Sequence, residues 1–575
     1  MAEPRIGVYI CNCGTNIAKV VNCDKICEAV SKLPRVAVAR TYKYMCSNPG
    51  QDMIVQDVKQ LGLDRVVVVA CSPRMHERTF RKALRTAGLN EYLLEMANIR
   101  EQCSWVHDDE FAATNKAQAL LQAAVMRVAY HEPLEKLSVD MCPNTLVIGG
   151  GIAGLTAALE MADAGHRVFL VERDDHLGGN LARVDLTAPH LDSARDLLTE
   201  RITRIRQCKN VQVMLGSTLK NLSGFVGNFV ATIGPAGSEG RTDQETSVEV
   251  GAVVVCTGYK EFDASRITYF GYGKLPNVVT SFEFERMLRA GRIECKDGKP
   301  PQYVAIIHCV GSRSQEFHGY CSRVCCMTAL KYAQEIKSAL PGSYVSDLYI
   351  DMHAFGKGHE DFYKQSSEVK TLFLMYGKNE HPVIKHAAPE DGCEMLIEVA
   401  EKLSGEVIEI PADMVILMVG MEARPDADRV ARLVNISQDK EGWFIESHPK
   451  LDPVATTTEG IFIAGTCAFP KDIPDTVAQA RAAAARILGK IAREKIEIDA
   501  VFAEVNEDCC SGCRMCNELC PYSAIEFDPE KGRSRVNSAL CKACGGCVAA
   551  CPSGAIKARH FTDQQIVAQI EGVLT

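Results

Sequence analysis

The C-terminal region contains two copies of one cysteine pattern, and this pattern constrains the chain more than any other feature. The copies read Cys510-x2-Cys513-x2-Cys516-x3-Cys520-Pro521 and Cys541-x2-Cys544-x2-Cys547-x3-Cys551-Pro552. This spacing is typical of a domain with two [4Fe–4S] clusters, in which the fourth cysteine of each run binds the other cluster. We predict one cluster on Cys510, Cys513, Cys516 and Cys551, and the other on Cys541, Cys544, Cys547 and Cys520. A zinc site is the alternative, but zinc prefers two C-x2-C pairs.

Composition narrows the class of protein. The chain has 575 residues, which suggests roughly three to five domains, and a net charge of -9 without a basic block, which disfavours nucleic-acid binding. We expect no signal peptide and no membrane span, because the longest apolar run, 414–421, is too short. We therefore expect a soluble, cytoplasmic protein. Its 26 cysteines then favour reduced thiols and metal ligands, and an anaerobic or microaerobic host.

A glycine-rich motif predicts a dinucleotide site. Gly149-x-Gly151-x-x-Gly154 follows a strand expected at 144–148 and opens a helix expected at 155–164. A second strand, 167–171, leads into Glu172, which suits a ribose hydroxyl. A strand that runs into an ordinary glycine-rich turn is the alternative. The contacts predicted from this region are Gly149, Gly151, Ile152, Ala153, Gly154, Glu172, Arg173, Gly179 and Asn180.

Two later segments favour FAD over NAD. Residues 252–258 read as a strand that ends in Thr257-Gly258, and residues 460–465 precede a helix expected at 476–488. The first is similar to a strand and turn found late in two-dinucleotide-binding flavoproteins, and the second resembles the closing flavin motif of thioredoxin-reductase-like proteins. These resemblances imply contacts from Thr257, Gly258, Gly465, Thr466, Asp472 and Ile473. Lys471 is a candidate catalytic cation for an anionic flavin, and a solvated surface lysine is the alternative.

The second dinucleotide domain of such flavoproteins has a cysteine group where its glycine motif should be. The strand 303–307 is followed by His308-Cys309-Val-Gly311, so the phosphate-binding turn is missing. We predict a third [4Fe–4S] cluster on Cys309, Cys321, Cys325 and Cys326; buried structural thiols are the alternative. His308 is a candidate catalytic residue that could hydrogen-bond the cluster or the flavin, unless it is a core histidine.

Several long strings resemble the A subunit of heterodisulfide reductase in its short form. They include Gly7-Val-Tyr-Ile-Cys11-Asn-Cys13-Gly, Tyr44-Met-Cys46-Ser, the segments 70–77 and 98–107, His308-Cys309-Val-Gly-Ser and 320–326. Some family members carry another ferredoxin domain in the FAD region, but residues 173–250 here contain only Cys208. The resemblance implies an N-terminal [4Fe–4S] cluster, for which the candidates are Cys11, Cys46, Cys71 and Cys103, with Cys13 close by. Ordinary thiols at strand ends are the alternative.

The predicted fold class is α/β: a thioredoxin-reductase-like two-dinucleotide-binding flavoprotein core, an N-terminal α/β domain and a C-terminal α+β two-cluster ferredoxin domain. The expected boundaries are 1–140 for the N-terminal domain, 141–300 and 436–498 for the FAD domain, 301–435 for the degenerate NAD(P)-like domain and 499–575 for the ferredoxin domain.

The resemblance implies an FAD and iron–sulfur electron-transfer component of a multisubunit anaerobic oxidoreductase, with electron bifurcation at the flavin. Its implied partners are other redox subunits, a ferredoxin and a second copy of the chain. One alternative is a non-bifurcating relay in a quinone-linked or aromatic-thioester-reducing complex. The other is a stand-alone NAD(P)H-dependent flavin reductase, which the missing nicotinamide site disfavours.

Overall fold

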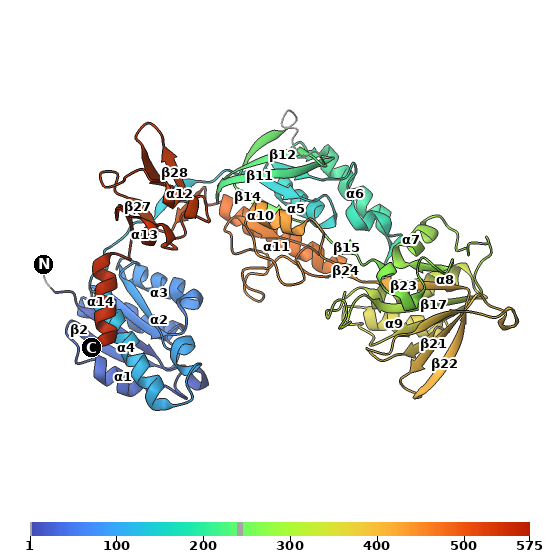
Figure 1. Ribbon diagram of the computed structural model, residues 1–575, viewed down its shortest axis with the longest axis horizontal. Coiled ribbons are helices and arrows are strands. Elements are labelled where there is room, and N and C mark those ends of the chain that lie inside the picture. The colour runs from blue at the N-terminus through green and yellow to red at the C-terminus, as the bar shows by residue number, and fades with distance from the viewer. Residues whose placement is uncertain (1–2, 238–244) are drawn as a thin grey trace. The chain divides into compact units, whose positions relative to one another are not determined.

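The computed structural model describes residues 3–237 and 245–575 and divides into two compact units (Figure 1). Unit 1 combines Met1–Ser138 with Glu497–Thr575, and unit 2 is Val139–Ile496. The N-terminal region and the ferredoxin region, far apart in sequence, therefore belong to one unit. The chain passes between the units at β5 (Leu137–Asp140) and β26 (Lys495–Ile498).

Unit 1 begins with a parallel sheet of four strands in the order β2-β1-β3-β4. The strands are β1 (Ile6–Cys11), β2 (Val36–Tyr42), β3 (Arg65–Ala70) and β4 (Leu94–Asn98). The helices are α1 (Cys23–Val30), α2 (Asn48–Leu61), α3 (Pro73–Ala87) and α4 (Glu110–Val128). Strand β3, Arg-Val-Val-Val-Val-Ala, is buried from Val66 onward, because β-branched residues suit a central parallel strand. The carboxyl ends of all four strands lie at one edge of the sheet.

The C-terminal part of unit 1 has the internal repeat that its cysteine pattern predicts. Its elements are β27 (Ala503–Val505), α12 (Met515–Leu519), β28 (Ile525–Asp528), β29 (Arg533–Val536), α13 (Gly546–Ala550), β30 (Ile556–Ala558) and α14 (Asp563–Leu574). Two antiparallel ladders, β27–β30 and β28–β29, accompany the two short helices. The mixed α and β elements agree with the predicted α+β class.

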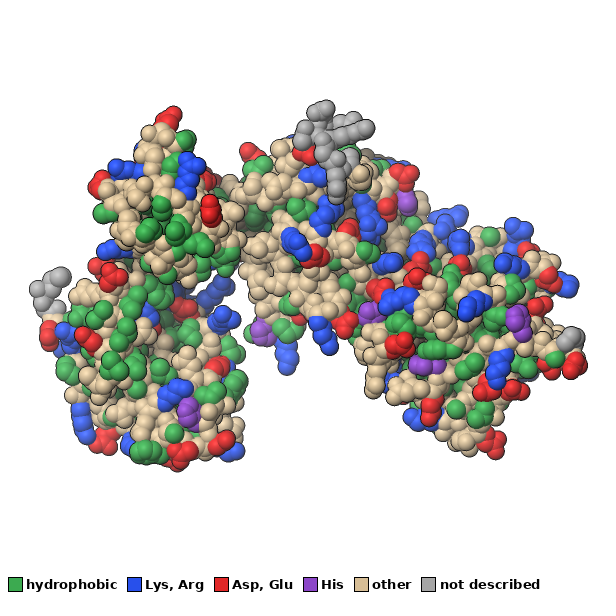
Figure 2. Space-filling view, viewed as in Figure 1, with side chains coloured by type: hydrophobic (Ala, Val, Ile, Leu, Met, Phe, Trp, Pro, Cys, Tyr) green, Lys and Arg blue, Asp and Glu red, His purple; other side chains and the backbone are tan. Residues whose placement is uncertain are grey.

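Helix α14 lies directly against α4 of the N-terminal sheet domain (Figure 1). A Cβ at Gly572 would come within 2.6 Å of the Ala123 Cα, so the absence of a side chain at Gly572 permits this approach. The opposite face of α14 carries exposed hydrophobic side chains (Figure 2): Ile566, Val567, Ile570, Val573 and Leu574.

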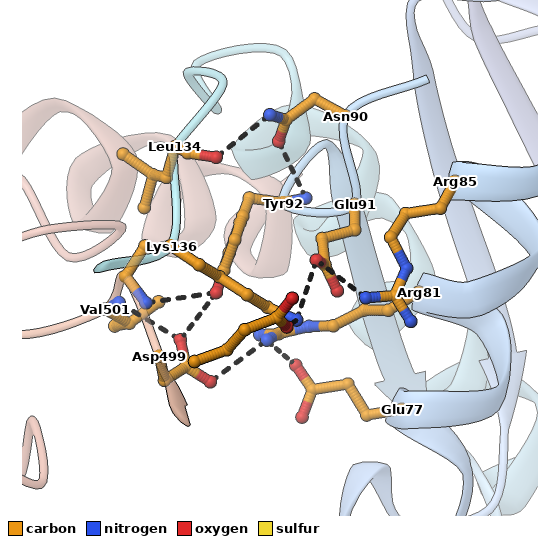
Figure 3. A network of polar contacts seen from close by, with 12 residues as sticks. Glu77, Arg81, Arg85, Asn90, Glu91, Tyr92, Leu134, Lys136, Asp499 and Val501 are labelled. Atoms are coloured by element: carbon orange, nitrogen blue, oxygen red, sulfur yellow. Dashed lines mark hydrogen bonds and ion pairs between the residues drawn. The ribbon is translucent and has the colours of Figure 1, made fainter. Parts of the chain in front are cut away.

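A polar network fastens residues 499–501 to the sheet domain (Figure 3). The Tyr92 hydroxyl donates to Asp499 Oδ1 (3.1 Å) and accepts from the Ala500 N–H (3.0 Å). Arg81 donates to Asp499 Oδ2 over 3.1 Å, and Lys136 Nζ lies 3.0 Å from Glu91 Oε1. Because Tyr92 is only 1% exposed, its two hydrogen bonds are shielded from water.

Unit 2 contains a first domain with a parallel sheet of five strands in the order β10-β7-β6-β14-β25. The strands are β6 (Thr145–Ile148), β7 (Val168–Val171), β10 (Val211–Met214), β14 (Ala252–Val255) and β25 (Ile461–Ile463), and the helices are α5 (Ile152–Asp163), α6 (Ala194–Gln207), α10 (Ala427–Val434) and α11 (Ile473–Ile491). An antiparallel sheet follows: β11 (Ser217–Phe225), β12 (Asn228–Pro235) and β13 (Thr246–Val250). Two short strands, β8 (Leu186–Thr187) and β9 (Asp192–Ser193), form a hairpin.

The second domain of unit 2 repeats this plan. Its parallel sheet has the order β16-β23-β17-β18-β19 and is followed by an antiparallel sheet, β20-β21-β22. The strands are β16 (Val278–Thr280), β17 (Tyr303–Val310), β18 (Tyr344–Tyr349), β19 (Leu372–Met375), β20 (Val383–His386), β21 (Met395–Glu401), β22 (Glu406–Ala412) and β23 (Met414–Val419), and the helices are α7 (Ser281–Arg289), α8 (Cys325–Ala339) and α9 (His359–Glu368). A small ladder between β15 (Lys260–Glu261) and β24 (Met421–Glu422) connects the domains. This doubled α/β plan confirms the predicted two-dinucleotide-binding core.

The apolar run 414–421 forms the buried strand β23 and part of β24. Across residues 3–237 and 245–575, we find no helix with the length and apolar character needed to cross a bilayer.

Candidate flavin cavity and cysteine clusters

A cavity of about 540 Å³ opens in unit 2 beside the glycine-rich turn between β6 and α5. Two glycines of this turn are needed for close backbone packing. A Cβ at Gly149, where φ is +111°, would lie 2.3 Å from the Cys256 carbonyl oxygen, and one at Gly154 would lie 1.8 Å from the Gly149 oxygen. At Gly151 a Cβ would meet no atom closer than 4.0 Å, so the missing side chain leaves open space at the cavity wall. That space suits a pyrophosphate at the N-terminus of α5.

Glu172 lies at the end of β7 and is 7% exposed. Its carboxylate accepts hydrogen bonds from the Gly150 N–H (2.6 Å) and the Asp174 N–H (2.9 Å), which fix its orientation at the cavity wall. Each carboxylate oxygen has a further lone pair. Glu172 can therefore still accept from a ribose hydroxyl, as the motif predicts.

Most of the predicted flavin-binding residues come together in the wall of this cavity. Those that line it are Gly149, Gly151, Ile152, Ala153, Glu172, Arg173, Gly179, Asn180, Thr257, Gly258, Thr466, Asp472 and Ile473. Gly154 and Gly465 do not line it: Gly154 packs against the backbone of the turn, and the Gly465 N–H donates to Gln479. Asp472 caps α11 by accepting from the Asp475 N–H (2.8 Å), and α11 begins at Ile473, three residues earlier than expected.

Lys471 also lines the cavity, as the sequence suggested. Its Nζ donates to the carbonyl oxygens of Gly465 (2.8 Å) and Phe469 (2.7 Å). Burial lowers the pKa of Lys471 to about 8, against the opposing effect of the Cys467 thiol. A lysine held in this way can place a positive charge near the cavity at neutral pH.

The four cysteines predicted to bind a third cluster lie together. Cys309 is the penultimate residue of β17, Cys321 follows in the next loop, and Cys325 and Cys326 lie in the first turn of α8. A hydrogen bond with Cys309 raises the pKa of Cys325, and a hydrogen bond with Cys325 and burial raise the pKa of Cys326. The Cys321 thiol accepts from the Arg323 N–H over 3.2 Å. Four thiols in one group, two of them in the first turn of a helix, fit the ligand chemistry of a [4Fe–4S] cluster.

Cys325 belongs to this group and also to the wall of the flavin cavity. Arg323, Val324 and Thr328 line the cavity beside it. The cysteine group and the flavin cavity are therefore neighbours within unit 2.

His308 is buried and does not line the cavity. Its Nε2 lies 2.6 Å from Asp347 Oδ1, and its backbone oxygen accepts from the Tyr376 hydroxyl over 2.7 Å. Burial lowers the pKa of His308, but the Asp347 carboxylate and the Cys326 thiol outweigh burial and raise the pKa to about 10. The contact with Cys326 places His308 behind the cysteine group, not against the flavin.

The structure also shows a group of cavity residues that sequence reasoning missed. Lys331 is 1% exposed, and its Nζ donates to Glu285 Oε1 over 2.5 Å. The Tyr332 hydroxyl donates to the same oxygen over 2.9 Å. All three residues line the cavity. Only the position of Lys331, five residues after the Cys325-Cys326 pair, could have drawn attention to it.

The structure brings the fourth cysteine of the first ferredoxin run to the second run. Cys520, from the first run, lies with Cys541, Cys544 and Cys547 around one small hollow of unit 1. Burial, with smaller contributions from Cys541, Cys544 and Cys520, raises the pKa of Cys547 to about 11. Backbone N–H groups donate to these sulfurs, from Ala503 to Cys541 (3.4 Å) and from Ala524 to Cys520 (3.3 Å). Such donors stabilise cluster-bound thiolates.

The N-terminal cysteines gather at the carboxyl edge of the unit 1 sheet. Strands β1 and β3 are parallel neighbours, so Cys11 and Cys71 meet there, as expected. Burial raises the pKa of Cys11 to about 11, and Cys13, Cys46 and Cys71 contribute to the rise. Cys103 instead lies in a short π-helix, Arg100–Ser104, within the apolar core beside α4, and is 0% exposed. The geometry therefore favours Cys13 over Cys103 as the fourth member of this group.

The described residues, 3–237 and 245–575, contain no group of three or more His, Cys, Asp or Glu arranged to hold a metal ion. A [4Fe–4S] cluster differs from a single ion, because it takes one thiolate on each of four irons and its ligands surround a larger volume.

Comparison with known proteins identifies two domains and several full-length relatives. Residues 144–223 match a family described as FAD dependent oxidoreductase, and residues 503–552 match one described as 4Fe-4S dicluster domain. The A subunit of the H(2):CoB-CoM heterodisulfide,ferredoxin reductase of Methanothermobacter thermautotrophicus is 39% identical, over 100% of this chain and 98% of the relative. The iron-sulfur A subunit of the CoB--CoM heterodisulfide reductase of Methanocaldococcus jannaschii is 38% identical, over 100% and 99%. Among solved structures, a thioredoxin reductase of T. acidophilum has a TM-score of 0.40 at 15% identity, covering 61% of this chain and 100% of its own.

Proposed function

Because this chain belongs to the family of heterodisulfide reductase A subunits, we propose that it distributes electrons from a flavin to partner proteins by electron bifurcation. At the coarser level it is a flavin and iron–sulfur electron-transfer subunit of an oxidoreductase, with FAD and [4Fe–4S] clusters as cofactors. A flavin supplies the chemistry that bifurcation needs, because it accepts two electrons together and releases them one at a time.

The observation that carries the proposal is the position of Cys325, which lies in the wall of the flavin cavity and in the cysteine group of the second domain. The group occupies the end of β17, where a nicotinamide-binding domain would have its glycine turn. Electrons would therefore enter or leave the flavin through an iron–sulfur cluster on Cys309, Cys321, Cys325 and Cys326.

The residues of the chain would hold and tune these cofactors. The backbone at Gly151 would accommodate the pyrophosphate of FAD, and Glu172 would accept from its ribose. Lys471 would favour negative charge in the cavity. The buried His308–Asp347 pair would hold the Cys326 sulfur in place from behind. We also assign a cluster to each ligand set of the ferredoxin domain and one to Cys11, Cys13, Cys46 and Cys71.

The partners we propose are other redox subunits, a ferredoxin and a second copy of this chain. The relatives suggest this choice: the name of the M. thermautotrophicus protein describes one subunit of a heterodisulfide,ferredoxin reductase. The ferredoxin domain in unit 1 would be one exit for single electrons.

Anaerobic purification of the untagged protein from its native cells tests the proposal. We expect stoichiometric redox subunits to co-purify, and the complex to reduce a ferredoxin only while a second, higher-potential acceptor is reduced. If ferredoxin reduction proceeds without the second acceptor, the protein is a simple relay. If the chain purifies without partners and oxidises NAD(P)H, it is neither a bifurcating subunit nor a relay within a complex.

A further inference from the structure

A group of buried charges forms one wall of the flavin cavity, where α7 meets α8. Lys331 Nζ donates to Glu285 Oε1 (2.5 Å) and to the Leu186 carbonyl oxygen (3.0 Å). The second oxygen of Glu285 accepts from the Asp185 N–H over 2.8 Å. The side chains of Lys331 and Glu285 are only 2% and 3% exposed. Both carboxylate oxygens of Glu285 therefore already accept hydrogen bonds, one of them from Lys331.

Glu335 occupies a different position relative to the same lysine. It lies one turn further along α8, and its Oε2 is 3.6 Å from Lys331 Nζ. This oxygen is buried and accepts no hydrogen bond from the described residues. Glu335 is absent from the cavity wall, whereas Lys331 lines it. The Glu335 side chain is 11% exposed, so it is in contact with solvent although it does not line the cavity.

We propose that Glu335 supplies protons to the flavin cavity through the ammonium group of Lys331. The inference rests on the proposed function in one respect: it needs a flavin in the cavity, since a flavin that gains two electrons also takes up a proton. Solvent, Glu335, Lys331 and the cavity then form a continuous route. Lys331 is the residue that touches the cavity, and Glu335 acts through it.

The proton steps balance without a further reactant. An N–H bond of Lys331 breaks as the reduced cofactor takes up the proton, and a neutral amine remains. The Glu335 carboxylic acid returns a proton to this amine and becomes a carboxylate. Water then reprotonates Glu335. The electrons come from the same donor that reduces the flavin, so only N–H and O–H bonds change.

The charges around Glu335 suit a proton donor. Burial raises the pKa of Glu335 to about 7, with Lys331 opposing this rise and the carboxylates of Glu285 and Asp185 adding to it. The groups that face it are Lys331 and the Tyr332 hydroxyl from α8, Glu285 from α7 and Asp185 from the segment before β8. A group that is half protonated near neutral pH can both give and regain a proton. Glu285 cannot serve this purpose, because both of its oxygens already accept hydrogen bonds.

The test uses the full-length holoprotein under anaerobic conditions and a Glu335→Gln substitution. The first measurement is the rate of flavin reduction by dithionite in stopped flow, from mildly acidic to mildly alkaline pH. We expect wild type to show an inflection near pH 7. Glu335→Gln should lose the inflection and slow the reduction about 100-fold, while Glu335→Asp should keep part of it. Glu368→Gln, an exposed carboxylate on α9, is the matched control and should behave as wild type.

The second measurement is independent of the rate. A time-resolved infrared difference spectrum, recorded while the wild-type holoprotein is being reduced, should contain a transient carboxylic-acid band that shifts in D₂O, and this band should vanish in Glu335→Gln. The proposal is overturned if wild type lacks the band, even if Glu335→Gln fails to fold, or if Glu335→Gln keeps both the band and the inflection. Since dithionite supplies the electrons, a failure of electron transfer to partners would leave this result unchanged.

Discussion

The guanidinium of Arg323 donates a hydrogen bond of 2.7 Å to Asp475 Oδ2. Arg323 lies between Cys321 and Cys325, and Asp475 lies in the first turn of α11, next to the flavin cavity. The same arginine donates its backbone N–H to the Cys321 sulfur. One residue thus connects the cysteine group of the second domain to the helix that closes the flavin site in the first.

Replacing Arg323 should change the cluster more than the fold. The ion pair is partly exposed, at 29% and 51%, so Arg323→Met should lower the free energy of unfolding by less than about 1 kcal/mol. Reduction adds negative charge to a cluster, so loss of the nearby cation should make its reduction potential more negative. An anaerobic redox titration followed by electron paramagnetic resonance measures this. Arg323→Lys should keep most of the wild-type potential, and an unchanged potential in Arg323→Met would contradict the assignment.

Alanine substitutions at Gly151 and Gly154, two glycines of one motif, should have different effects. Gly154→Ala places a Cβ 1.8 Å from a backbone oxygen, so the FAD domain should be strongly destabilised. Gly151→Ala meets only open space in the protein, so the fold should persist while the flavin site is blocked. We expect Gly151→Ala to purify with near wild-type thermal stability and iron content but with little FAD. Normal FAD content in Gly151→Ala would show that the pyrophosphate lies elsewhere.

Sequence reasoning found the features whose chemistry imposes a local pattern. The glycine turn at Gly149 and the crossing of Cys520 to the second cysteine run follow from fixed spacings, and the structure places both as expected. Lys331 was missed because its burial depends on Glu285, which approaches from another helix. The ligand set with Cys103 stays a prediction: Cys13 and Cys103 both follow strands, and the sequence does not show that Cys103 turns inward in the π-helix at Arg100–Ser104.

The N-terminal cysteines offer a direct comparison. Cys13→Ser should remove one [4Fe–4S] cluster per chain, because Cys13 lies with Cys11, Cys46 and Cys71. Cys103→Ala should keep all the iron and lose only about 1 kcal/mol of stability, because it removes one small buried side chain. Iron and acid-labile sulfide per chain are the measurements. Loss of iron in Cys103→Ala with retention in Cys13→Ser would restore the ligand set expected from sequence.

Acid should weaken unit 1 through a pair of stacked histidines. His131 and His560 stack with their ring centroids 4.4 Å apart, where the end of α4 meets the ferredoxin domain. Burial, and then the His131 charge, lowers the pKa of His560 to about 4, below the value near 6.5 of an unfolded histidine. The folded state therefore binds this proton less readily than the unfolded state. The stability is fully present above about pH 6.5 and is lost as the pH falls toward the folded pKa, by about 2 kcal/mol at pH 5.

His560→Asn tests this linkage, because asparagine tolerates the left-handed backbone at this position, where φ is +62°. In the variant, we expect the free energy of unfolding of unit 1 to fall much less than in wild type between about pH 6.5 and 5. This expectation holds whatever the stability of the variant at neutral pH. Pulse proteolysis in urea, with fragments assigned to each unit by mass, follows unit 1 separately, and unit 2 serves as the control in the same sample. If wild-type unit 1 is as stable at the lower pH as at neutral pH, or if His560→Asn declines as steeply as wild type, His560 does not sense acid in this way.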